Sequence, residues 1–281
     1  MRDTRGSSDQ VISCAGLKVA VRRVRRDGPV RGSILFINGA ITTLMALRWA
    51  ERGLQDFDLL LFDFPLVGAS ESLNPGLARL SREDEVAVVA ALVHRYAPDY
   101  LISLSWGGMA ALAALTQRPA SIRRAIVSSF SLRVTEPLRG LCEDLVALAD
   151  AQRLGEAARV AVEELGQHLP ERMKDAYRRY FEMLSPAQVA YLHDHMKALP
   201  DLDATALLGR LGAIEIPVLF ANGAGDRFTP PSAARDFAAH VRGAQFTQFP
   251  DAGHFLALES RATCDRVCET VRGFFPALVP A

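Results

Sequence analysis

The chain has 281 residues, of which 49% are hydrophobic and 23% charged, a composition typical of a globular protein with one large core and room for a smaller unit. Its 32 basic and 32 acidic side chains cancel, which argues against a nucleic-acid-binding protein. The polar start and the lack of a bilayer-length apolar run predict a cytoplasmic protein with no targeting or transmembrane segment.

Strand and helix patterns alternate along most of the chain. Two short alternating runs, residues 11–14 and 17–24, predict antiparallel edge strands. Mostly continuous apolar runs predict buried strands at residues 33–38, 58–64, 100–105, 125–130 and 216–222, and a further strand is expected at residues 244–249. Helical periodicity covers residues 43–54, 81–96, 106–117, 231–240 and 259–275. The alternation predicts an α/β fold, with a mainly parallel sheet flanked by helices on both faces.

The alternation stops after residue 131. Residues 132–212 show helical periodicity without a convincing strand, and they are divided by Pro137, Pro170, Pro186 and Pro200. Connections of this length without secondary structure are rare, so we expect a helical cap inserted between two core strands. The predicted division is a core of residues 1–131 and 213–281 and a cap of residues 132–212.

The segment at residues 103–108 predicts a nucleophilic serine. It reads Ser103-Leu104-Ser105-Trp106-Gly107-Gly108, follows an apolar strand and opens a helix. A sharp strand-to-helix turn can lift a serine hydroxyl above the sheet edge, provided that small residues stand two positions on either side. Gly107 meets this need, and Ser103 stands where glycine is usual. A plain turn with a capping serine is the alternative to Ser105 as nucleophile.

A base for this serine is predicted in the loop after the last strand. A serine hydroxyl is a weak nucleophile until a base removes its proton, and His254 lies between that strand and the final helix. Asp226, at the end of the strand over residues 216–222, is expected to orient the imidazole. Asp63 is the rival acid, but Pro65 and Gly68 follow it and favour a role in a turn.

Backbone donors for a developing oxyanion are expected at two places. One is the N–H of Trp106, directly after the candidate nucleophile, and the other is the N–H of Ala40, in the loop after the strand over residues 33–38. Asn38 stands where many enzymes with this architecture carry histidine. The order serine, acid, histidine along the chain is typical of the α/β-hydrolase fold, which we therefore expect.

No metal site and no cofactor are expected. The chain has no CxxC pair and no metal-ligand spacing among its cysteines, which are Cys14, Cys142, Cys264 and Cys268. Reduced thiols in a cytoplasmic protein explain them. His193 and His195 are two apart on a predicted helix, so their side chains point in different directions and do not favour a metal pair.

Four of these motifs together resemble a known family. They are Asn38-Gly39-Ala40, Leu61-Phe62-Asp63-x-Pro65-x-x-Gly68-x-Ser70, Ser103-x-Ser105-Trp106-Gly107-Gly108 and Gly253-His254-Phe255-Leu256. From about residue 17 to residue 275 the chain resembles the bacterial 3-hydroxyacyl transferases of the α/β-hydrolase superfamily. That family includes 3-(3-hydroxyalkanoyloxy)alkanoate synthases and 3-hydroxyacyl-acyl carrier protein:coenzyme A transacylases. Arg227 and Ala257 replace residues that are usually acidic in the family, which concerns the acceptor rather than the triad.

The resemblance implies an acyltransferase. Ser105 would take a 3-hydroxyacyl group from a thioester, on acyl carrier protein or coenzyme A, and pass it to the 3-hydroxyl of a second hydroxyacyl unit. The products would be 3-(3-hydroxyalkanoyloxy)alkanoates for rhamnolipid-type biosurfactants. Transfer to coenzyme A for polyhydroxyalkanoate supply, or to water by a plain esterase or thioesterase, is the alternative. A non-catalytic binding module on the same fold is the alternative from another class.

Apolar side chains of the predicted cap are candidates for an acyl-binding tunnel. The candidates are Met173, Phe181, Met183, Leu184 and Tyr191, together with Phe228 on the core side. The simpler interpretation makes them packing faces of amphipathic helices. Two basic clusters are candidates for contact with an acidic carrier protein, although solvated surfaces explain them as well; they are Arg22, Arg23, Arg25 and Arg26, and Arg172, Lys174, Arg178 and Arg179.

Overall fold

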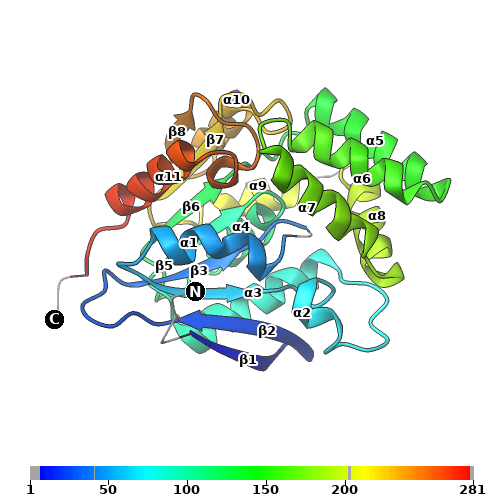
Figure 1. Cartoon of the computed structure of the whole chain (residues 1–281). Helices are drawn as coiled ribbons and strands as arrows, with labels where there is room; N and C mark the ends of the chain where they lie inside the picture. Colours follow the sequence, from blue (N-terminus) through cyan, green and yellow to red (C-terminus); the bar gives the residue numbers. More distant parts are fainter. Residues whose placement is uncertain (1–6, 41, 202–203, 279–281) are drawn as a thin grey trace.

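A single sheet of eight strands organises the computed structural model, which describes residues 7–40, 42–201 and 204–278. The strand order is β1-β2-β4-β3-β5-β6-β7-β8. The strands span Ser7–Cys14 (β1), Leu17–Val24 (β2), Ser33–Ile37 (β3), Asp58–Phe62 (β4), Tyr100–Leu104 (β5), Arg124–Ser128 (β6), Val218–Gly223 (β7) and Gln245–Phe249 (β8). All neighbours from β4 to β8 pair in parallel, which confirms the predicted fold class (Figure 1).

Only the amino-terminal hairpin departs from the expected strands. β1 pairs antiparallel with β2, and β2 in turn pairs antiparallel with β4. The prediction that residues 17–24 form an edge strand is therefore wrong, because β2 lies between two other strands. β1 also begins earlier than expected, since its first four residues are polar and exposed and carry no alternating signal.

The core helices follow the expected order. They are α1 (Arg48–Gly53), α3 (Arg82–Tyr96), α4 (Gly107–Leu115), α10 (Pro231–Ala234) and α11 (Arg261–Phe274). Two of the predicted helices are partly 3₁₀-helical, at η1 (Leu44–Leu47) and η2 (Arg235–Ala239). The short α2 (Gly68–Glu71) and η3 (Leu256–Leu258) were not expected, because helices of three or four residues leave no periodic signal.

The sheet has a separate apolar core on each face. On one face Leu35, Leu101 and Val127 pack among side chains of α3 and α4. On the other face Ile34, Ile102 and Ile126 pack among side chains of α1 and α11. Alternate residues of the central strands face opposite cores, which explains why their sequences are continuously apolar. The cores fix the strand ends from which the functional loops start.

Five helices lie between β6 and β7, where a helical cap was expected. They are α5 (Glu136–Asp150), α6 (Leu154–Leu165), α7 (Glu171–Glu182), α8 (Pro186–Ala198) and α9 (Thr205–Leu211). Helices α5 to α8 pack on one another at one side of the sheet (Figure 1). α9 differs, because its Leu207 and Leu211 join the core beneath α4. Among the described helices none is both long and apolar enough to cross a membrane.

A close backbone approach joins the ends of β7 and β8. Gly223 ends β7, and a Cβ atom at this position would overlap the carbonyl oxygens of Ala252 and Gly253 in the loop after β8. Gly225 donates its backbone N–H to the Ala252 carbonyl oxygen over 2.9 Å, which holds the two loops together. Only glycine at position 223 allows this packing.

We predict that Gly223→Ala lowers the free energy of unfolding by about 1–3 kcal/mol, because the two loops must separate to admit the methyl group. Chemical unfolding monitored by circular dichroism measures the change. Gly209→Ala in α9 is the matched control, since its added Cβ would meet nothing within 4 Å. That change should be neutral or stabilising by up to about 1 kcal/mol. Equal effects of the two substitutions would contradict the role of the close approach.

Candidate active site

The turn between β5 and α4 presents Ser105. Its backbone adopts φ 48°, in the left-handed region that non-glycine residues seldom occupy. The Ser105 N–H donates to the Ser128 carbonyl oxygen over 2.9 Å, and the Gly108 N–H donates to the Ser105 carbonyl oxygen over 2.8 Å. A Cβ atom on Gly107 would overlap the Asn38 carbonyl oxygen, so the start of α4 lies close against the end of β3 and a small residue is needed here.

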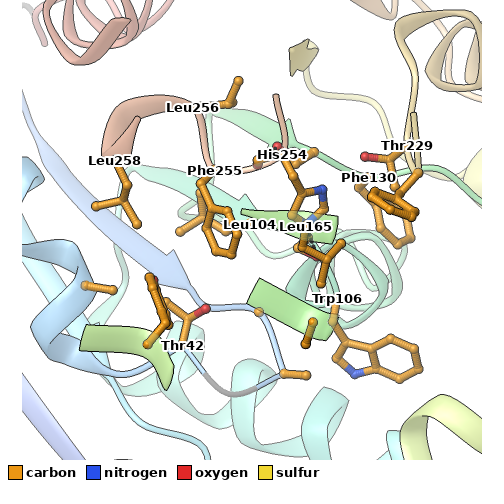
Figure 2. A pocket seen from close by; sticks show the side chains of 18 of the residues that line it. Thr42, Leu104, Trp106, Phe130, Leu165, Thr229, His254, Phe255, Leu256 and Leu258 are labelled. Atoms are coloured by element: carbon orange, nitrogen blue, oxygen red, sulfur yellow. Dashed lines mark hydrogen bonds between the residues drawn. The ribbon is translucent and has the colours of Figure 1, made fainter. Parts of the chain in front are cut away.

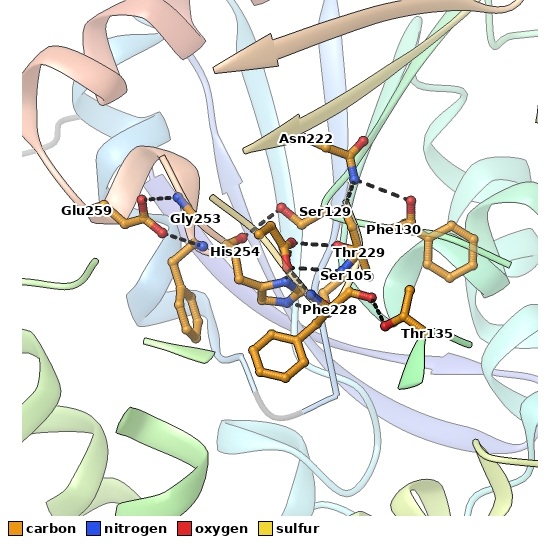
Figure 3. Close-up of polar contacts among 12 residues, drawn as sticks. Ser105, Ser129, Phe130, Thr135, Asn222, Phe228, Thr229, Gly253, His254 and Glu259 are labelled. Carbon is orange, nitrogen blue, oxygen red and sulfur yellow. Dashed lines mark hydrogen bonds and ion pairs between the residues drawn. The ribbon is translucent and has the colours of Figure 1, made fainter. Parts of the chain in front are cut away.

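Ser105, His254 and Asp226 form one hydrogen-bonded chain (Figure 3). His254 Nε2 lies 2.9 Å from Ser105 Oγ, and His254 Nδ1 lies 2.8 Å from Asp226 Oδ2. The three residues follow β5, β8 and β7, whose parallel carboxyl ends meet at one edge of the sheet. This is the arrangement needed for a base that accepts the serine proton and an acid that orients the base.

The carboxylate of Asp226 is held by further donors. Its Oδ1 accepts the backbone N–H groups of Phe228 and Thr229, over 2.9 and 3.0 Å, and its Oδ2 accepts the Thr229 hydroxyl over 2.6 Å. Burial alone would raise the pKa of Asp226, but the charge of His254 and these hydrogen bonds outweigh it and lower the pKa to about 2. Asp226 therefore stays ionised beside His254. The part played by Thr229 was not expected from the sequence.

The backbone on both sides of His254 is held by a second carboxylate. Glu259 accepts the N–H of Gly253 over 2.7 Å and that of Phe255 over 2.9 Å, and Ser129 donates its hydroxyl to the His254 carbonyl oxygen (Figure 3). Burial disfavours a charged imidazole, yet Asp226 and Glu259 outweigh it and raise the pKa of His254 above its ordinary value. The sequence signal for Glu259 was weak, since it stands next to a helix-capping serine like many surface acids.

Asp63, the rival acid, is used in a turn. It is buried, and its two oxygens accept the backbone N–H groups of Leu44 and Ala69, over 2.8 and 2.9 Å. Burial raises its pKa to about 6, against the effect of these hydrogen bonds. The carboxylate also fills the space beside Gly68, whose φ of 50° and lack of a side chain permit the turn. These contacts fit the structural role expected for Asp63.

The loop after β3 lies against the candidate nucleophile. A Cβ atom on Gly39 would lie 3.4 Å from the Ser105 Cβ atom. Gly39, Ala40 and Trp106 line the same cavity as Ser105. The two expected oxyanion donors, the backbone N–H groups of Ala40 and Trp106, thus belong to segments that border the Ser105 hydroxyl.

An apolar cavity of about 280 Å³ extends from Ser105 and His254 (Figure 2). Its wall includes Leu141, Leu165 and Leu192 from the cap, and Leu104 and Leu258 from the core. The volume is close to the lower end of the range for ligand pockets, which is roughly 300–1,000 Å³. An unbranched acyl chain is the kind of group that such a wall can surround.

The candidate lining residues divide into two groups. Phe181, Leu184 and Phe228 lie on the wall of this cavity, whereas the described lining does not include Met173 or Met183. The side chain of Met183 is 74% exposed, at the end of α7. Tyr191 is also absent from that lining, because its hydroxyl donates to Glu85 over 2.5 Å on the side of α8 that faces the core.

The two neighbouring histidines of α8 point apart, as expected. His193 lines the cavity and contacts Asp150 over 2.9 Å, whereas His195 is buried and contacts Glu85 over 3.0 Å. Within the described ranges no group of three or more His, Cys, Asp or Glu side chains could hold a metal ion. All four cysteines are free.

The chain is similar to known proteins in sequence and in structure. A model of the alpha/beta hydrolase family matches residues 34–267. A Pseudomonas putida protein named (R)-3-hydroxydecanoyl-ACP:CoA transacylase is 32% identical over 258 residues, which cover 90% of this chain and 86% of that protein. The Pseudomonas aeruginosa protein of the same name is 32% identical over 248 residues, covering 86% and 81%.

Two solved structures share the fold. The enol-lactonase from Burkholderia xenovorans LB400 superposes with a TM-score of 0.76 at 20% identity, covering 94% of this chain and 99% of that one. A thermophilic esterase from Thermogutta terrifontis gives a TM-score of 0.73 at 19% identity, covering 95% and 97%. At these identities the likeness establishes the architecture alone.

The contacts of Asp226 and Asp63 predict that removing the charge of the first lowers activity, whereas removing the charge of the second lowers stability. Asp226→Asn should lower the rate of ester cleavage about a thousandfold or more, because an amide favours the wrong tautomer of His254. Asp63→Asn should act on stability instead, lowering the free energy of unfolding by about 1–3 kcal/mol, since one backbone N–H then faces an amide NH₂ group. Initial rates and thermal unfolding of both variants measure the contrast, and a reversed pattern would make Asp63 the acid.

The pKa of His254 predicts where activity fails in acid. Only the neutral imidazole can accept a proton, so a raised pKa means that activity is lost as pH falls through a value above the ordinary 6.5. A pH–rate profile measures this, and the residual activity of Asp226→Asn should show a lower midpoint. Asp251→Asn is the control, because that side chain is 79% exposed and should leave the profile unchanged. A wild-type rate that stays flat down to about pH 5 would rule out a histidine base.

Proposed function

The chain belongs to the alpha/beta hydrolase family and is an acyl-transferring enzyme of the serine type, and we propose that it moves 3-hydroxyacyl groups from acyl carrier protein to coenzyme A. The observation that carries the proposal is the triad of Ser105, His254 and Asp226 on the wall of an apolar cavity beneath helical segments. The name shared by the relatives, (R)-3-hydroxydecanoyl-ACP:CoA transacylase, supports the choice of donor and acceptor. Both carriers act in the cytoplasm, which is the location that the proposal implies.

The first half-reaction forms an acyl-enzyme. Ser105 Oγ attacks the thioester carbonyl carbon while His254 Nε2 accepts the hydroxyl proton. The backbone N–H groups of Ala40 and Trp106 stabilise the resulting oxyanion. When the carbon–sulfur bond breaks, the imidazolium returns the proton to the departing thiolate of the carrier. Asp226 keeps the imidazole oriented and stabilises its charged form in this step.

The second half-reaction runs the same steps in reverse order. The coenzyme A thiol gives its proton to His254 Nε2 and attacks the acyl-enzyme carbonyl carbon. Collapse of the oxyanion breaks the bond to Ser105 Oγ, which regains a proton from the imidazolium. Hydrolysis is suppressed only if water is kept from the acyl group, and the apolar lining, with Phe181, Leu184 and Phe228, supports such exclusion.

A second acceptor, the 3-hydroxyl of another hydroxyacyl group, is favoured by the extent of the cavity. One part of its wall belongs to α5, α6 and α8, and another part to Trp49 of α1, Leu258 of η3 and Thr270 of α11. Figure 2 places Leu258 and Phe255 on one side of His254 and the Phe130 ring on the other. Acyl chains in both parts would meet near Ser105, as the synthesis of 3-(3-hydroxyalkanoyloxy)alkanoates requires.

The basic clusters give little support to a docking surface for the carrier. In the cluster on α7, Lys174 pairs with Glu163 and Glu171, and Arg178 pairs with Glu163 and Asp175. In the cluster on β2 and the loop after it, Arg22 pairs with Asp9, and Arg26 donates to backbone carbonyl oxygens. The proposed contact with acyl carrier protein therefore rests on the donor chemistry and not on these clusters.

Product analysis tests the acceptor. With 3-hydroxydecanoyl-acyl carrier protein and coenzyme A, we expect 3-hydroxydecanoyl-coenzyme A to be the main product by mass spectrometry. A predominant hydroxyacyl-oxy-acid ester would instead favour the second acceptor, and predominant free hydroxy acid would make the enzyme a thioesterase. Ser105→Ala should abolish each product, with a loss of about a thousandfold or more.

Ser103→Ala is the matched control for that loss. Ser103 is buried in the same motif, and its hydroxyl has no hydrogen-bond partner among the described residues. Its removal should therefore leave the product pattern unchanged and the rate close to that of the wild type.

A further inference from the structure

Glu85 places a carboxylate in the apolar stripe of α3. The buried residues of this helix include Glu85, Val88, Val89 and Leu92, at the spacing of one helix face. Only 1% of Glu85 is exposed. A buried carboxylate costs free energy unless hydrogen bonds compensate it, so its partners should explain its presence.

Three side chains contact the Glu85 carboxylate. Trp106 Nε1 donates to Oε2 over 3.0 Å, and the Tyr191 hydroxyl donates to Oε1 over 2.5 Å. His195 Nε2 lies 3.0 Å from the same Oε1. Trp106 begins the turn into α4, whereas Tyr191 and His195 lie one turn apart on α8. A single carboxylate thus joins the residue after the candidate nucleophile to a helix of the inserted segment.

The contacts of His195 require a proton shared with Glu85. His195 Nδ1 lies 3.0 Å from the Tyr191 carbonyl oxygen, which can only accept, so Nδ1 carries a hydrogen atom. In a neutral imidazole Nε2 would then be an acceptor facing a carboxylate oxygen. The close contact needs one more proton between them, either on His195 as an imidazolium or on Glu85 as a carboxylic acid. Both forms leave the pair with no net charge.

The indole of Trp106 is fixed from several directions. Besides its hydrogen bond to Glu85, its ring centroid lies 4.2 Å from that of His195, and the Arg82 guanidinium carbon lies 5.3 Å from it. The backbone N–H of this same residue is the proposed oxyanion donor. A displaced indole would therefore displace the donor.

The opposite side of α8 forms part of the cavity wall. Val189, Leu192 and Met196 line the cavity, while Tyr191 and His195 face Glu85. The position of α8 relative to Ser105 thus depends on the same carboxylate that holds Trp106.

We propose that Glu85 is a positioning residue. The length of its side chain allows its carboxylate to hydrogen-bond to Trp106 and to α8 at the same time, which holds the oxyanion donor at Trp106 and the α8 wall of the acyl cavity in one arrangement. The inference rests on the proposed roles of Ser105 and Trp106. It is independent of the acceptor, because it concerns the formation of the acyl-enzyme.

Two substitutions distinguish the effect of the length of the Glu85 side chain from the effect of its charge. Glu85→Gln keeps the length of the side chain, since its amide oxygen can accept from Trp106 and its NH₂ group can donate to a neutral His195 Nε2. Glu85→Asp keeps the charge but is one methylene shorter, so it cannot keep both Trp106 and α8 in place. The burst of p-nitrophenol from p-nitrophenyl octanoate gives the acylation rate and the KM for each variant.

We expect Gln to retain the acylation rate and the KM within about threefold, and Asp to lower the acylation rate about tenfold or more. Trp106→Phe removes the indole donor and should lower the rate to a similar extent. Combined with Glu85→Asp it should add little, because both substitutions break the same link. In a Trp49→Phe background Trp106 is the only tryptophan, and its emission should shift with Asp but not with Gln.

Four results would overturn the proposal. Wild-type acylation in Glu85→Asp, with only a lower melting temperature, would mean a purely structural role. A loss in Gln equal to that in Asp would mean that the length of the side chain does not account for the role, because Gln keeps that length. Full additivity of Glu85→Asp and Trp106→Phe would mean that they act separately. Should Glu85→Asp fail to fold, a wild-type rate in Trp106→Phe alone overturns the link.

The failure of the proposed function gives a different result. If the wild-type protein releases no p-nitrophenol, or releases it as fast as Ser105→Ala does, Ser105 forms no acyl-enzyme and the assignment of the site is wrong. A normal wild-type burst with unaffected Glu85 and Trp106 variants removes only the positioning role.

Discussion

Ser105 can direct its hydroxyl to His254 only while its backbone holds φ at 48°, and the packing around the turn has to supply the free energy for this. A left-handed conformation at a non-glycine residue costs about 1–3 kcal/mol. Gly107 and Gly108 contribute to this packing, because their lack of side chains allows α4 to touch the end of β3 and the ring of Phe130. The two apolar cores on either face of the sheet keep these strands and helices at that separation.

Buried carboxylates hold the loops at this edge of the sheet by a common device. Asp63, Asp226 and Glu259 each accept two backbone N–H groups. The donors to Asp226 follow β7 and those to Glu259 follow β8, whereas Asp63 accepts from Leu44 after β3 and from Ala69 after β4. A carboxylate with two such donors fixes the local backbone more tightly than a neutral acceptor would. Asp226 alone also contacts the imidazole, so the same kind of side chain serves structure at two places and the proposed chemistry at one.

The sequence predicted most of the architecture because the relevant signals are local. Five mostly continuous apolar runs located the strands β3 to β7, and the residues of the proposed triad could be chosen from their places at strand ends. What escaped depends on tertiary contacts. Glu259 and Thr229 resemble ordinary surface residues until the fold brings them to the backbone beside His254 and to Asp226. The apolar character of Tyr191 did not indicate which face of α8 lines the cavity. The hydroxyl of Tyr191 donates to Glu85, so this residue lies on the face of α8 away from the cavity.

The division of the cavity wall between distant parts of the chain separates the selection of a substrate from its chemistry. The proposed reacting groups lie on loops after β5, β7 and β8, whereas much of the wall belongs to α5, α6 and α8, which the chain inserts as one stretch. Substitutions at the cavity-facing positions of α5 and α6 can shorten or widen the space for an aliphatic tail without disturbing the proposed link from α8 through Glu85 to Trp106. Descendants of such a scaffold can diversify the lipids they handle by altering a region that takes no part in bond making.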